Sequence, residues 1–221
     1  MRFGLFGGTF NPIHLGHLRA ALEVKEGFKL EEIFLIPAAL PPHKIPSEVV
    51  DAGDRLHMLN LALEDTAGLS VSDVELKRSG PSYTIDTVNY FKSALPEKSQ
   101  IYLVMGLDAF LEIDSWKSYD ELLVKVPIIV INRPITDSRL SSVGWEVMDD
   151  YLKSSISVDY KFSELQSCYL AGEKQPIYIF EVTALDISST RIRSLIKEGR
   201  SIGYLVPRKV AKFINSRGLY L

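Results

Sequence analysis

The amino-acid sequence predicts an α/β fold with a doubly wound, parallel sheet. Short apolar runs, typical of strands buried on both faces, recur along the chain. Segments in which apolar residues repeat with a helical period separate most of these runs. The chain has 221 residues, 46% of them hydrophobic, which is sufficient for a sizeable core. Alternating strands and helices need crossover connections, so they predict parallel strands with helices on both faces of the sheet.

The first 40 residues predict a strand, a helix and a second strand. The apolar run at residues 2–6 is typical of a buried strand, and residues 7–12 are predicted to form a loop. Within residues 14–27 apolar side chains fall on one helical face, and Gly27 marks the end of that helix. Residues 32–36 form the second strand. Such a unit joins parallel strands through a right-handed crossover.

Strands and helices continue to alternate along the rest of the chain. Residues 136–175 lack a clear period, and we interpret them as an insertion with a helix near residues 144–153. We therefore predict a single domain, residues 1–221, whose closing helices lie within residues 187–221. The other predicted elements are a proline-rich loop at 38–53, a helix at 54–66, a strand at 69–76, a helix at 83–94, strands at 101–105, 127–131 and 177–182, and helices at 189–198 and 207–216.

The composition argues against several classes of protein. The chain has 25 basic and 28 acidic residues, and this balance argues against binding to nucleic acid or to a membrane surface. No apolar stretch approaches the ~18 residues that a transmembrane helix needs. Cys168 is the only cysteine, so no internal disulfide can form and the chain needs no oxidising compartment. We therefore predict a cytoplasmic protein, and the sequence is compatible with a homo-oligomer.

The segment between the first strand and the first helix carries the strongest functional signal. Glycines let the backbone approach a ligand closely, and the start of a helix offers unpaired N–H groups and the positive end of its dipole. We therefore predict a phosphate site in which two imidazoles donate hydrogen bonds. Histidines at this spacing also occur as packing residues or as zinc ligands, but no further ligand is evident. The segment reads GGTFNPIHLGH and contains Gly7, Gly8, Thr9, Phe10, His14 and His17.

A second phosphate motif is predicted near the C-terminus, where residues 187–193 read ISSTRIR. Ser188 or Ser189 can cap the helix that follows, and Thr190 adds another hydroxyl at its start. Arg193 adds a delocalised positive charge that suits a polyphosphate. An ordinary helix cap with exposed arginines gives the same pattern. The interpretation of this motif as a phosphate site therefore depends on the presence of the histidine segment.

Polar and aromatic residues also follow other predicted strands. Asp108, two residues after Gly106, can bind ribose hydroxyls or can cap a helix. Trp116 can stack on a flat heteroaromatic ring or pack in the core. Lys44 is either an exposed loop lysine or is aimed by the proline-stiffened sequence PPHK, and Arg133 follows another strand. Because a doubly wound sheet binds ligands at the carboxyl ends of its strands, these residues are candidate contacts.

Taken together, these motifs resemble those of a known family. The segment GGTFNPIHLGH resembles the HxGH signature of the nucleotidyltransferase superfamily, with Asn11 where Asp is commoner, and ISSTRIR resembles its ISSTxIR motif. The sequence PPHK, the SYTIDT run at residues 82–87, and Gly-Leu-Asp followed by Trp116 are similar to bacterial nicotinate-nucleotide adenylyltransferases. The resemblance runs from about residue 3 to the C-terminus, apart from residues 136–175.

The resemblance implies a Rossmann-like nucleotidyltransferase fold and an enzyme of NAD biosynthesis. Such an enzyme transfers AMP from ATP to nicotinate mononucleotide, giving deamido-NAD and pyrophosphate, with Mg²⁺ held mainly through ATP phosphates and water. By matching position, the catalytic residues are His14, His17, Lys44 and Arg193; the ATP-binding residues are Gly7, Gly8, Thr9, Phe10, Gly106, Asp108, Ser188, Ser189 and Thr190; and the acceptor-binding residues are Thr84, Trp116, Lys117 and Arg133.

Other functions are compatible with parts of this pattern. Another HxGH enzyme, such as pantetheine-phosphate adenylyltransferase or a cytidylyltransferase, shares the histidine segment but is not expected to carry SYTIDT with the downstream tryptophan. A non-catalytic nucleotide sensor on the same fold is disfavoured because both histidines, Lys44 and Arg193 are retained. The family often has Asn where this chain has Ala38 or Ala39, so we expect one acceptor contact to be lost or replaced.

Overall fold

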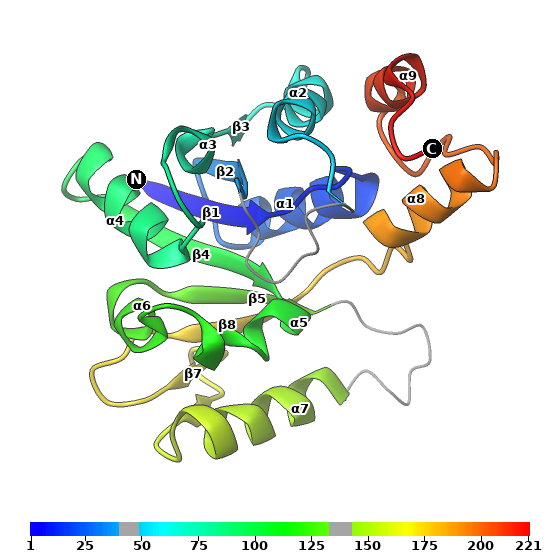
Figure 1. Cartoon of the computed structure of the whole chain (residues 1–221). Helices are drawn as coiled ribbons and strands as arrows, with labels where there is room; N and C mark the ends of the chain where they lie inside the picture. Colours follow the sequence, from blue (N-terminus) through cyan, green and yellow to red (C-terminus); the bar gives the residue numbers. More distant parts are fainter. Residues whose placement is uncertain (40–48, 133–142) are drawn as a thin grey trace.

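The computed structural model describes residues 1–39, 49–132 and 143–221. Within these ranges the strands form one sheet in the order β3-β2-β1-β4-β5-β8-β7-β6 (Figure 1). The first six strands in this order are mutually parallel, and the last two pair antiparallel. The strands are β1 (Arg2–Gly8), β2 (Glu32–Pro37), β3 (Leu69–Val71), β4 (Gln100–Gly106), β5 (Ile128–Asn132), β6 (Lys161–Ser163), β7 (Cys168–Leu170) and β8 (Ile177–Glu181).

The chain reverses its direction of growth across the sheet between β1 and β4. From β1 it passes through α1 (Leu15–Gly27) to β2 and through α2 (Ala52–Leu63) to β3, on one side of β1. It then returns to β4 on the other side of β1 and continues outward to β5. In sheets of this kind the carboxyl ends of the strands at the reversal form the ligand crevice. The predicted doubly wound sheet is confirmed.

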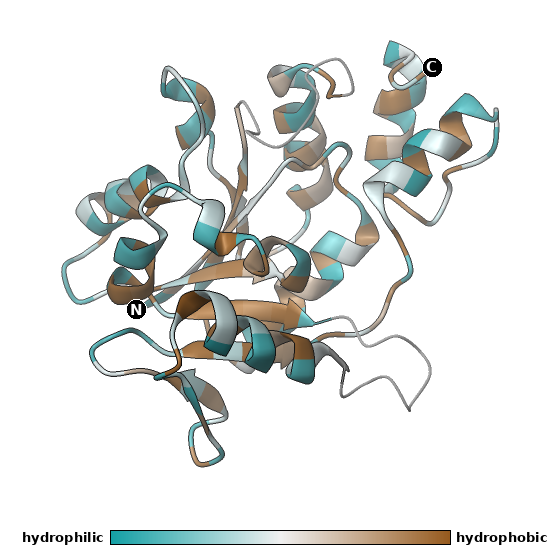
Figure 2. Cartoon of the chain, turned by 60° about the horizontal axis from the view of Figure 1, so that its bottom comes forward, coloured by the Kyte–Doolittle hydropathy of each residue, from teal (hydrophilic) through white to brown (hydrophobic). Residues whose placement is uncertain are grey.

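The two faces of the sheet are covered by two separate sets of buried side chains. Successive residues of a strand point to opposite faces, so Leu5 and Leu103 join one cluster whereas Phe6 and Val104 join the other. Figure 2 shows the strands mainly in the hydrophobic colour and the helices with hydrophilic outer sides. The Phe6 cluster contains residues of α1, α2, α8 (Ser189–Lys197) and α9 (Arg208–Arg217), and the Leu5 cluster contains residues of α4 (Thr84–Ala94), α5 (Leu107–Phe110), α6 (Tyr119–Lys125) and α7 (Val143–Tyr151).

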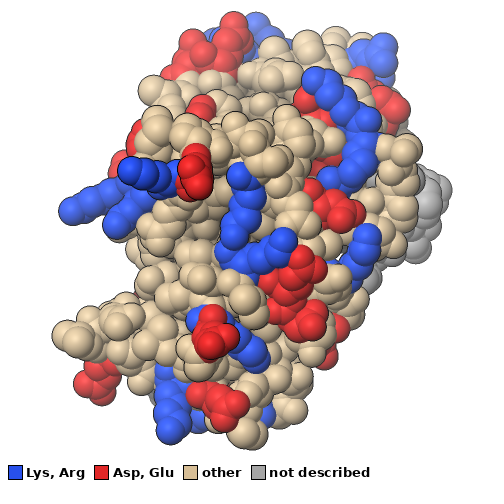
Figure 3. All heavy atoms as spheres, turned by 90° about the vertical axis from the view of Figure 1, so that its left-hand side faces the viewer, with Lys and Arg blue, Asp and Glu red and all other residues tan. Residues whose placement is uncertain are grey.

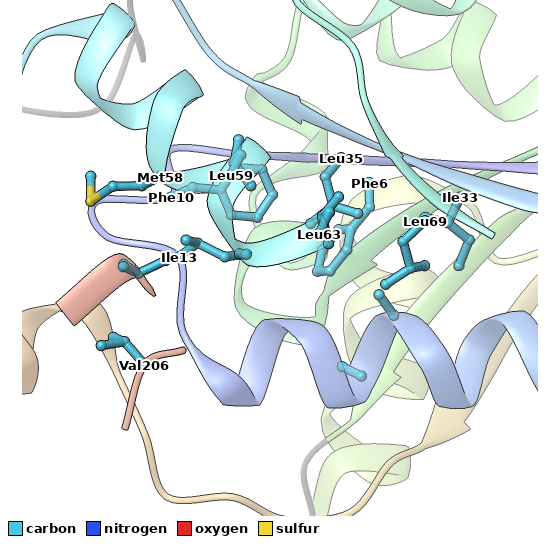
Figure 4. Packing of buried hydrophobic residues seen from close by; sticks show 14 of the residues in the cluster. Phe6, Phe10, Ile13, Ile33, Leu35, Met58, Leu59, Leu63, Leu69 and Val206 are labelled. Carbon is cyan, nitrogen blue, oxygen red and sulfur yellow. The ribbon is translucent and has the colours of Figure 1, made fainter. Parts of the chain in front are cut away.

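The loop after β1 is anchored by its own apolar residues. Phe10 is 3% exposed and Ile13 is fully buried, and both belong to the Phe6 cluster. Figure 4 places them near Met58 and Leu59 of α2 and near Val206, which precedes α9. Burying one such side chain contributes about 1.5–3 kcal/mol, so the loop is held by the core on both sides of its turn.

Two predicted boundaries are wrong. The predicted strand at 69–76 ends at Val71, and residues 74–77 form the short helix α3 (Val74–Lys77), in which the Lys77 amide donates to the Asp73 carbonyl. The predicted loop at 7–12 starts later, because Gly7 and Gly8 still pair with β2. The short elements α5, η2 (Ile113–Ser115) and α6 were not predicted, since fewer than eight residues carry little periodic signal.

The described part of the predicted insertion extends the main sheet. The predicted helix at 144–153 is confirmed as α7, which continues into a π-helical turn, η3 (Leu152–Ile156). A hairpin of β6 and β7 follows, and β7 pairs antiparallel with β8. This segment therefore adds the antiparallel edge to an otherwise parallel sheet.

Surface charges are mixed on the side of the molecule drawn in Figure 3. Lysine and arginine side chains lie beside aspartate and glutamate side chains over that face. Exposed pairs include Lys209 of α9 with Glu64, the C-cap residue of α2, at 2.7 Å, and Arg217 of α9 with Asp54 of α2 at 3.4 Å. Among the helices in the described ranges, none has the length and apolar character that crossing a bilayer requires.

Candidate active site

Two adjoining cavities open at the carboxyl ends of β1 and β4. They share Gly7, Thr9 and Gly106 as lining residues. The larger cavity, of about 790 Å³, falls within the usual size of a small-molecule or cofactor pocket, and the smaller pocket is about 290 Å³. Both lie where the topology predicts a ligand crevice.

Every predicted site residue that the structure describes lines one of these cavities. The histidine segment and the ISSTRIR motif, about 170 residues apart in the sequence, meet in the larger cavity. Lys44 and Arg133 lie outside the described residues. The larger cavity contains Gly7, Thr9, Phe10, His14, His17, Gly106, Asp108, Ser188, Ser189, Thr190 and Arg193, and the smaller pocket contains Gly7, Gly8, Thr9, Thr84, Gly106, Trp116 and Lys117.

His14 and His17 fix each other at the start of α1. His14 is the N-cap of the helix, and its Nδ1 accepts a hydrogen bond from the His17 amide at 3.3 Å. The Nδ1 of His17 accepts from the His14 amide at 3.3 Å, and the ring centroids are 3.6 Å apart. Because each Nδ1 is an acceptor, the neutral ring carries its proton on Nε2. Both imidazoles are therefore set as Nε2–H donors, the form that suits phosphate oxygens.

Gly16 leaves the space that the His14 ring occupies. A Cβ at this position would lie 3.1 Å from the His14 Nδ1 and 3.2 Å from its Cε1, which is tighter than ordinary packing. On the other side, the Phe10 ring meets His17 edge to face at 5.2 Å. The sequence His-Leu-Gly-His thus encodes a packed pair of rings as well as a helix start.

The start of α8 is bound directly to the loop that precedes the histidines. The Ser189 hydroxyl donates to the Pro12 carbonyl at 2.8 Å, and Nη1 of Arg193 donates to the Asn11 carbonyl at 2.9 Å. Ser188 caps α8 as predicted, with its Oγ accepting from the Arg191 amide at 3.1 Å. These bonds hold the two phosphate motifs in one fixed relation.

Asn11 is a buried junction between distant segments. Its side chain is 4% exposed, and Oδ1 accepts from the Val50 amide at 3.3 Å and from the Tyr220 hydroxyl at 2.9 Å. Burial raises the pKa of Tyr220 above its ordinary value, against the opposing charges of Arg193 and Arg55, so the phenol remains a donor at neutral pH. The Asn11 side chain therefore links the loop before the histidines to Val50 and to the segment after α9.

Arg55 supports the same loop, and sequence reasoning missed it. The side chain is 1% exposed, and its guanidinium donates to the carbonyls of Thr9 at 3.0 Å, Val50 at 3.1 Å and Ala39 at 3.4 Å. Burial lowers the pKa of Arg55, whereas Tyr220 and Asp51 raise it. A signal existed in the sequence, because residue 55 shares a helical face with Met58 and Leu59 and therefore had to point inward.

The smaller pocket is bordered by the start of α4 and by residues 115–117. Trp116 is half-buried and lines the pocket together with Tyr83 and Thr84. Nζ of Lys117 lies 4.4 Å from the centroid of the Tyr83 ring and 3.5 Å from the Asp86 carboxylate, so its side chain joins these two borders. Ala38, where the family often has Asn, also lines the pocket. Trp116 thus lines the smaller pocket, as a stacking residue would.

Asn132 is a second site residue that was not predicted. It ends β5, is 6% exposed and lines the larger cavity. A Cβ at Gly144 would lie 2.6 Å from its Nδ2, so α7 packs closely against this amide. The available signal was a polar residue directly after a buried apolar run, at the end where ligands bind.

The fold, the paired histidines and the docked serine-threonine-arginine motif define a nucleotidyltransferase. In agreement, a family described as cytidylyltransferase-like matches residues 5–195. The chain belongs to the nicotinate-nucleotide adenylyltransferase family. It is 42% identical to a probable nicotinate-nucleotide adenylyltransferase from Desulfatibacillum aliphaticivorans, over 100% of both chains. It is 40% identical to one from Pseudomonas fluorescens, over 99% of this chain and 97% of the relative.

Solved structures of similar proteins agree on the fold. Plasmodium falciparum nicotinic acid mononucleotide adenylyltransferase complexed with NaAD superposes with a TM-score of 0.72 at 17% identity, covering 99% of this chain and 97% of that one. The same protein complexed with APC gives a TM-score of 0.70 over 99% of this chain and 96% of that one, at 17% identity. At this level of identity the likeness establishes the shared architecture.

Proposed function

We propose that this enzyme transfers AMP from ATP to nicotinate mononucleotide, forming deamido-NAD and pyrophosphate in the cytoplasm. One observation carries the proposal: two phosphate motifs meet in a cavity that opens beside a smaller pocket containing Trp116. The larger cavity suits a nucleoside triphosphate and the smaller pocket suits a flat ring. The names of the full-length relatives support the same acceptor. We treat residues 1–221 as one nucleotidyltransferase domain.

In the proposed reaction the acceptor supplies its own nucleophile. The second pKa of a phosphate monoester is about 6, so the mononucleotide phosphate is mainly a dianion at pH 7. One of its oxygens attacks the α-phosphorus of ATP, a new P–O bond forms, and the bond to the β-phosphate oxygen breaks. Pyrophosphate leaves with that electron pair. No side chain has to remove a proton, which agrees with a site built of hydrogen-bond donors.

The protein contributes alignment and charge stabilisation. We assign His14, His17 and Arg193 to the triphosphate, where their N–H groups offset the negative charge that grows as pyrophosphate leaves. Asp108 is assigned to the ribose hydroxyls. Ser188, Ser189, Thr190 and the loop of Gly7, Gly8, Thr9 and Phe10 complete the ATP site, and Gly106 lies between ATP and acceptor. Lys44 and Arg133 are assigned to the phosphates by resemblance.

The acceptor ring is assigned to the smaller pocket. Trp116 would stack on the nicotinate ring, with Thr84 beside it. The ring carboxylate would accept hydrogen bonds from backbone N–H groups near Thr84 and Lys117. Thr84 begins α4, and the first N–H groups of a helix lack partners within it, so they suit an anion.

The site fits Mg²⁺ that arrives with the nucleotide. Within the described ranges no group of three or more histidine, cysteine or acidic side chains is arranged to hold a metal ion. Mg²⁺ commonly binds through phosphate oxygens, water and one or two carboxylates, and Asp108 lines the larger cavity. When bound, Mg²⁺ would neutralise part of the triphosphate charge.

A panel of acceptors tests the proposal. With ATP and Mg²⁺, we expect pyrophosphate release with nicotinate mononucleotide, much less with nicotinamide mononucleotide, and none with phosphopantetheine. Chromatography of the nucleotide product identifies deamido-NAD. Turnover of phosphopantetheine would favour the pantetheine-phosphate alternative, and no pyrophosphate with any acceptor would favour a nucleotide sensor.

Replacing Trp116 with alanine is expected to raise the KM for nicotinate mononucleotide roughly tenfold, since stacking on an aromatic side chain contributes about 1–3 kcal/mol. The KM for ATP should change less than about twofold. Trp145→Ala is the matched control, because Trp145 lies on α7 and packs on Phe162 with ring centroids 5.2 Å apart. Equal rises in both KM values for Trp116→Ala would contradict the stacking role.

A further inference from the structure

A buried hydrogen-bond relay joins α3 to α4 beside the smaller pocket. Thr87 is 3% exposed, and its hydroxyl donates to Oε1 of Glu75, which is 7% exposed, at 2.7 Å. Nη2 of Arg78 donates to the Thr87 Oγ1 at 3.2 Å and to the Tyr83 carbonyl at 3.3 Å. The relay therefore consists of Glu75, Thr87 and Arg78 and ends on the backbone of Tyr83.

The chemistry of these groups fixes the direction of every bond. A threonine hydroxyl has one proton, and the Thr87 hydroxyl lies 2.7 Å from the Glu75 carboxylate but 3.5 Å from the Tyr83 carbonyl, so the carboxylate is the favoured acceptor. The oxygen lone pairs then face the Arg78 guanidinium, which is donor-only. With one N–H on the hydroxyl, the planar guanidinium directs another interaction at the Tyr83 carbonyl. Glu75 thus orients Thr87, and Thr87 orients Arg78.

The relay ends where α4 begins. Tyr83 is the N-cap of α4 and makes no side-chain capping hydrogen bond, and its carbonyl accepts from the amides of Asp86 and Thr87. Glu75, Tyr83, Thr84 and Thr87 all line the smaller pocket. The relay therefore links the first turn of α4 to α3 and fixes the position of that turn at the edge of the pocket.

We propose that Glu75, Thr87 and Arg78 are positioning residues that set the preference for an acidic over an amide acceptor. The proposal rests on the acceptor site proposed above, in which N–H groups at the start of α4 bind the ring carboxylate. An anion gains from both the direction of these N–H groups and the helix dipole. A carboxamide gains less from either, so loosening the first turn weakens binding of the acid more than binding of the amide.

The test is Thr87→Val, which keeps the branched shape and removes the hydroxyl. KM and kcat are measured with nicotinate mononucleotide and with nicotinamide mononucleotide, with ATP saturating. We expect the KM for the acid to rise about tenfold, as for the loss of one or two hydrogen bonds to charged groups. The KM for the amide and that for ATP should change less than about twofold. The acid-over-amide ratio of kcat/KM should fall about tenfold.

Two further variants separate positioning from stability. Thr87→Ser retains the hydroxyl and should restore the ratio. Arg78→Met removes both hydrogen bonds that Nη2 donates from a half-buried position and should lower the ratio. Arg78→Met also tests the relay if Thr87→Val fails to fold. Ser93→Ala is the matched control, since its exposed hydroxyl donates to the Tyr90 carbonyl of the same helix at 2.8 Å.

The outcomes are distinct. Suppose that the wild-type enzyme prefers the acid. Variants that keep this preference, or that lose activity with both acceptors equally, would then overturn the proposed role of the relay and leave the proposed reaction intact. Failure of Thr87→Ser to recover the ratio would also overturn it. A wild-type protein that uses neither mononucleotide would instead remove the proposed function on which the relay depends.

Discussion

Substituting His17 with alanine is expected to lower kcat by about 10²–10³, the usual cost of removing one well-placed donor to a developing negative charge. The Nε2–H of His17 is fixed by its Nδ1 contact with the His14 amide and lines the larger cavity. The KM for nicotinate mononucleotide should change little, because His17 does not line the smaller pocket. Steady-state release of pyrophosphate measures both quantities.

The fold of the His17 variant should be retained. The substitution removes one capping contact, which costs about 1 kcal/mol, and the ring contacts of His17 with His14 and Phe10, so we expect a thermal melt to shift by a few degrees while the protein still folds. His57→Ala provides the same substitution at an exposed histidine, which packs on Phe213 at 4.5 Å between ring centroids. That control should retain kcat within about twofold. A His17 variant with near-normal kcat would show that the imidazole does not act on the phosphates.

Arg55→Met is expected to lower the free energy of unfolding by about 3–5 kcal/mol. Methionine fills similar space but leaves the part-buried carbonyls of Thr9 and Val50 without their donor, at about 1–3 kcal/mol each. The melting temperature should fall by roughly 10 °C for a domain of this size. Urea unfolding followed by circular dichroism measures the change.

A surface arginine that binds α2, the helix of Arg55, serves as the control. Arg217 on α9 has a side chain that is 60% exposed and pairs with Asp54 on α2 at 3.4 Å. Exposed pairs contribute little, so Arg217→Met should change stability by less than about 0.5 kcal/mol. A loss below about 1 kcal/mol for Arg55→Met would mean that the loop carbonyls find other donors, and that Arg55 does not hold the loop.

Local sequence patterns were sufficient to predict the elements that place the site. The strand, helix and strand within residues 2–36 follow from apolar runs and helical periodicity, and the structure confirms all three. The histidine segment was predicted at the start of α1, where the structure has it. These predictions succeed because backbone propensity, patterning and the glycine loop all point to the same local structure.

Contacts between distant segments were not predictable in this way. Asn11 and Tyr220 are 209 residues apart, and neither the turn around Asn11 nor the end of α9 indicates the other. Arg55 binds the carbonyls of Thr9, Ala39 and Val50, and these three groups are brought together only in the folded chain. The prediction of a strand at 69–76 failed for a related reason, because residues 74–77 form α3, in which Val74 packs against the Leu5 cluster.

The hydrogen bond between Tyr220 and Asn11 joins the segment after α9 to the loop that precedes the histidines. The two residues are 209 positions apart, so their contact closes a very long stretch of chain. Loop-closure entropy opposes such a contact until other interactions have brought its two ends together. We therefore expect the loop before the histidines to reach its final geometry late in folding, after α9 has packed against α2.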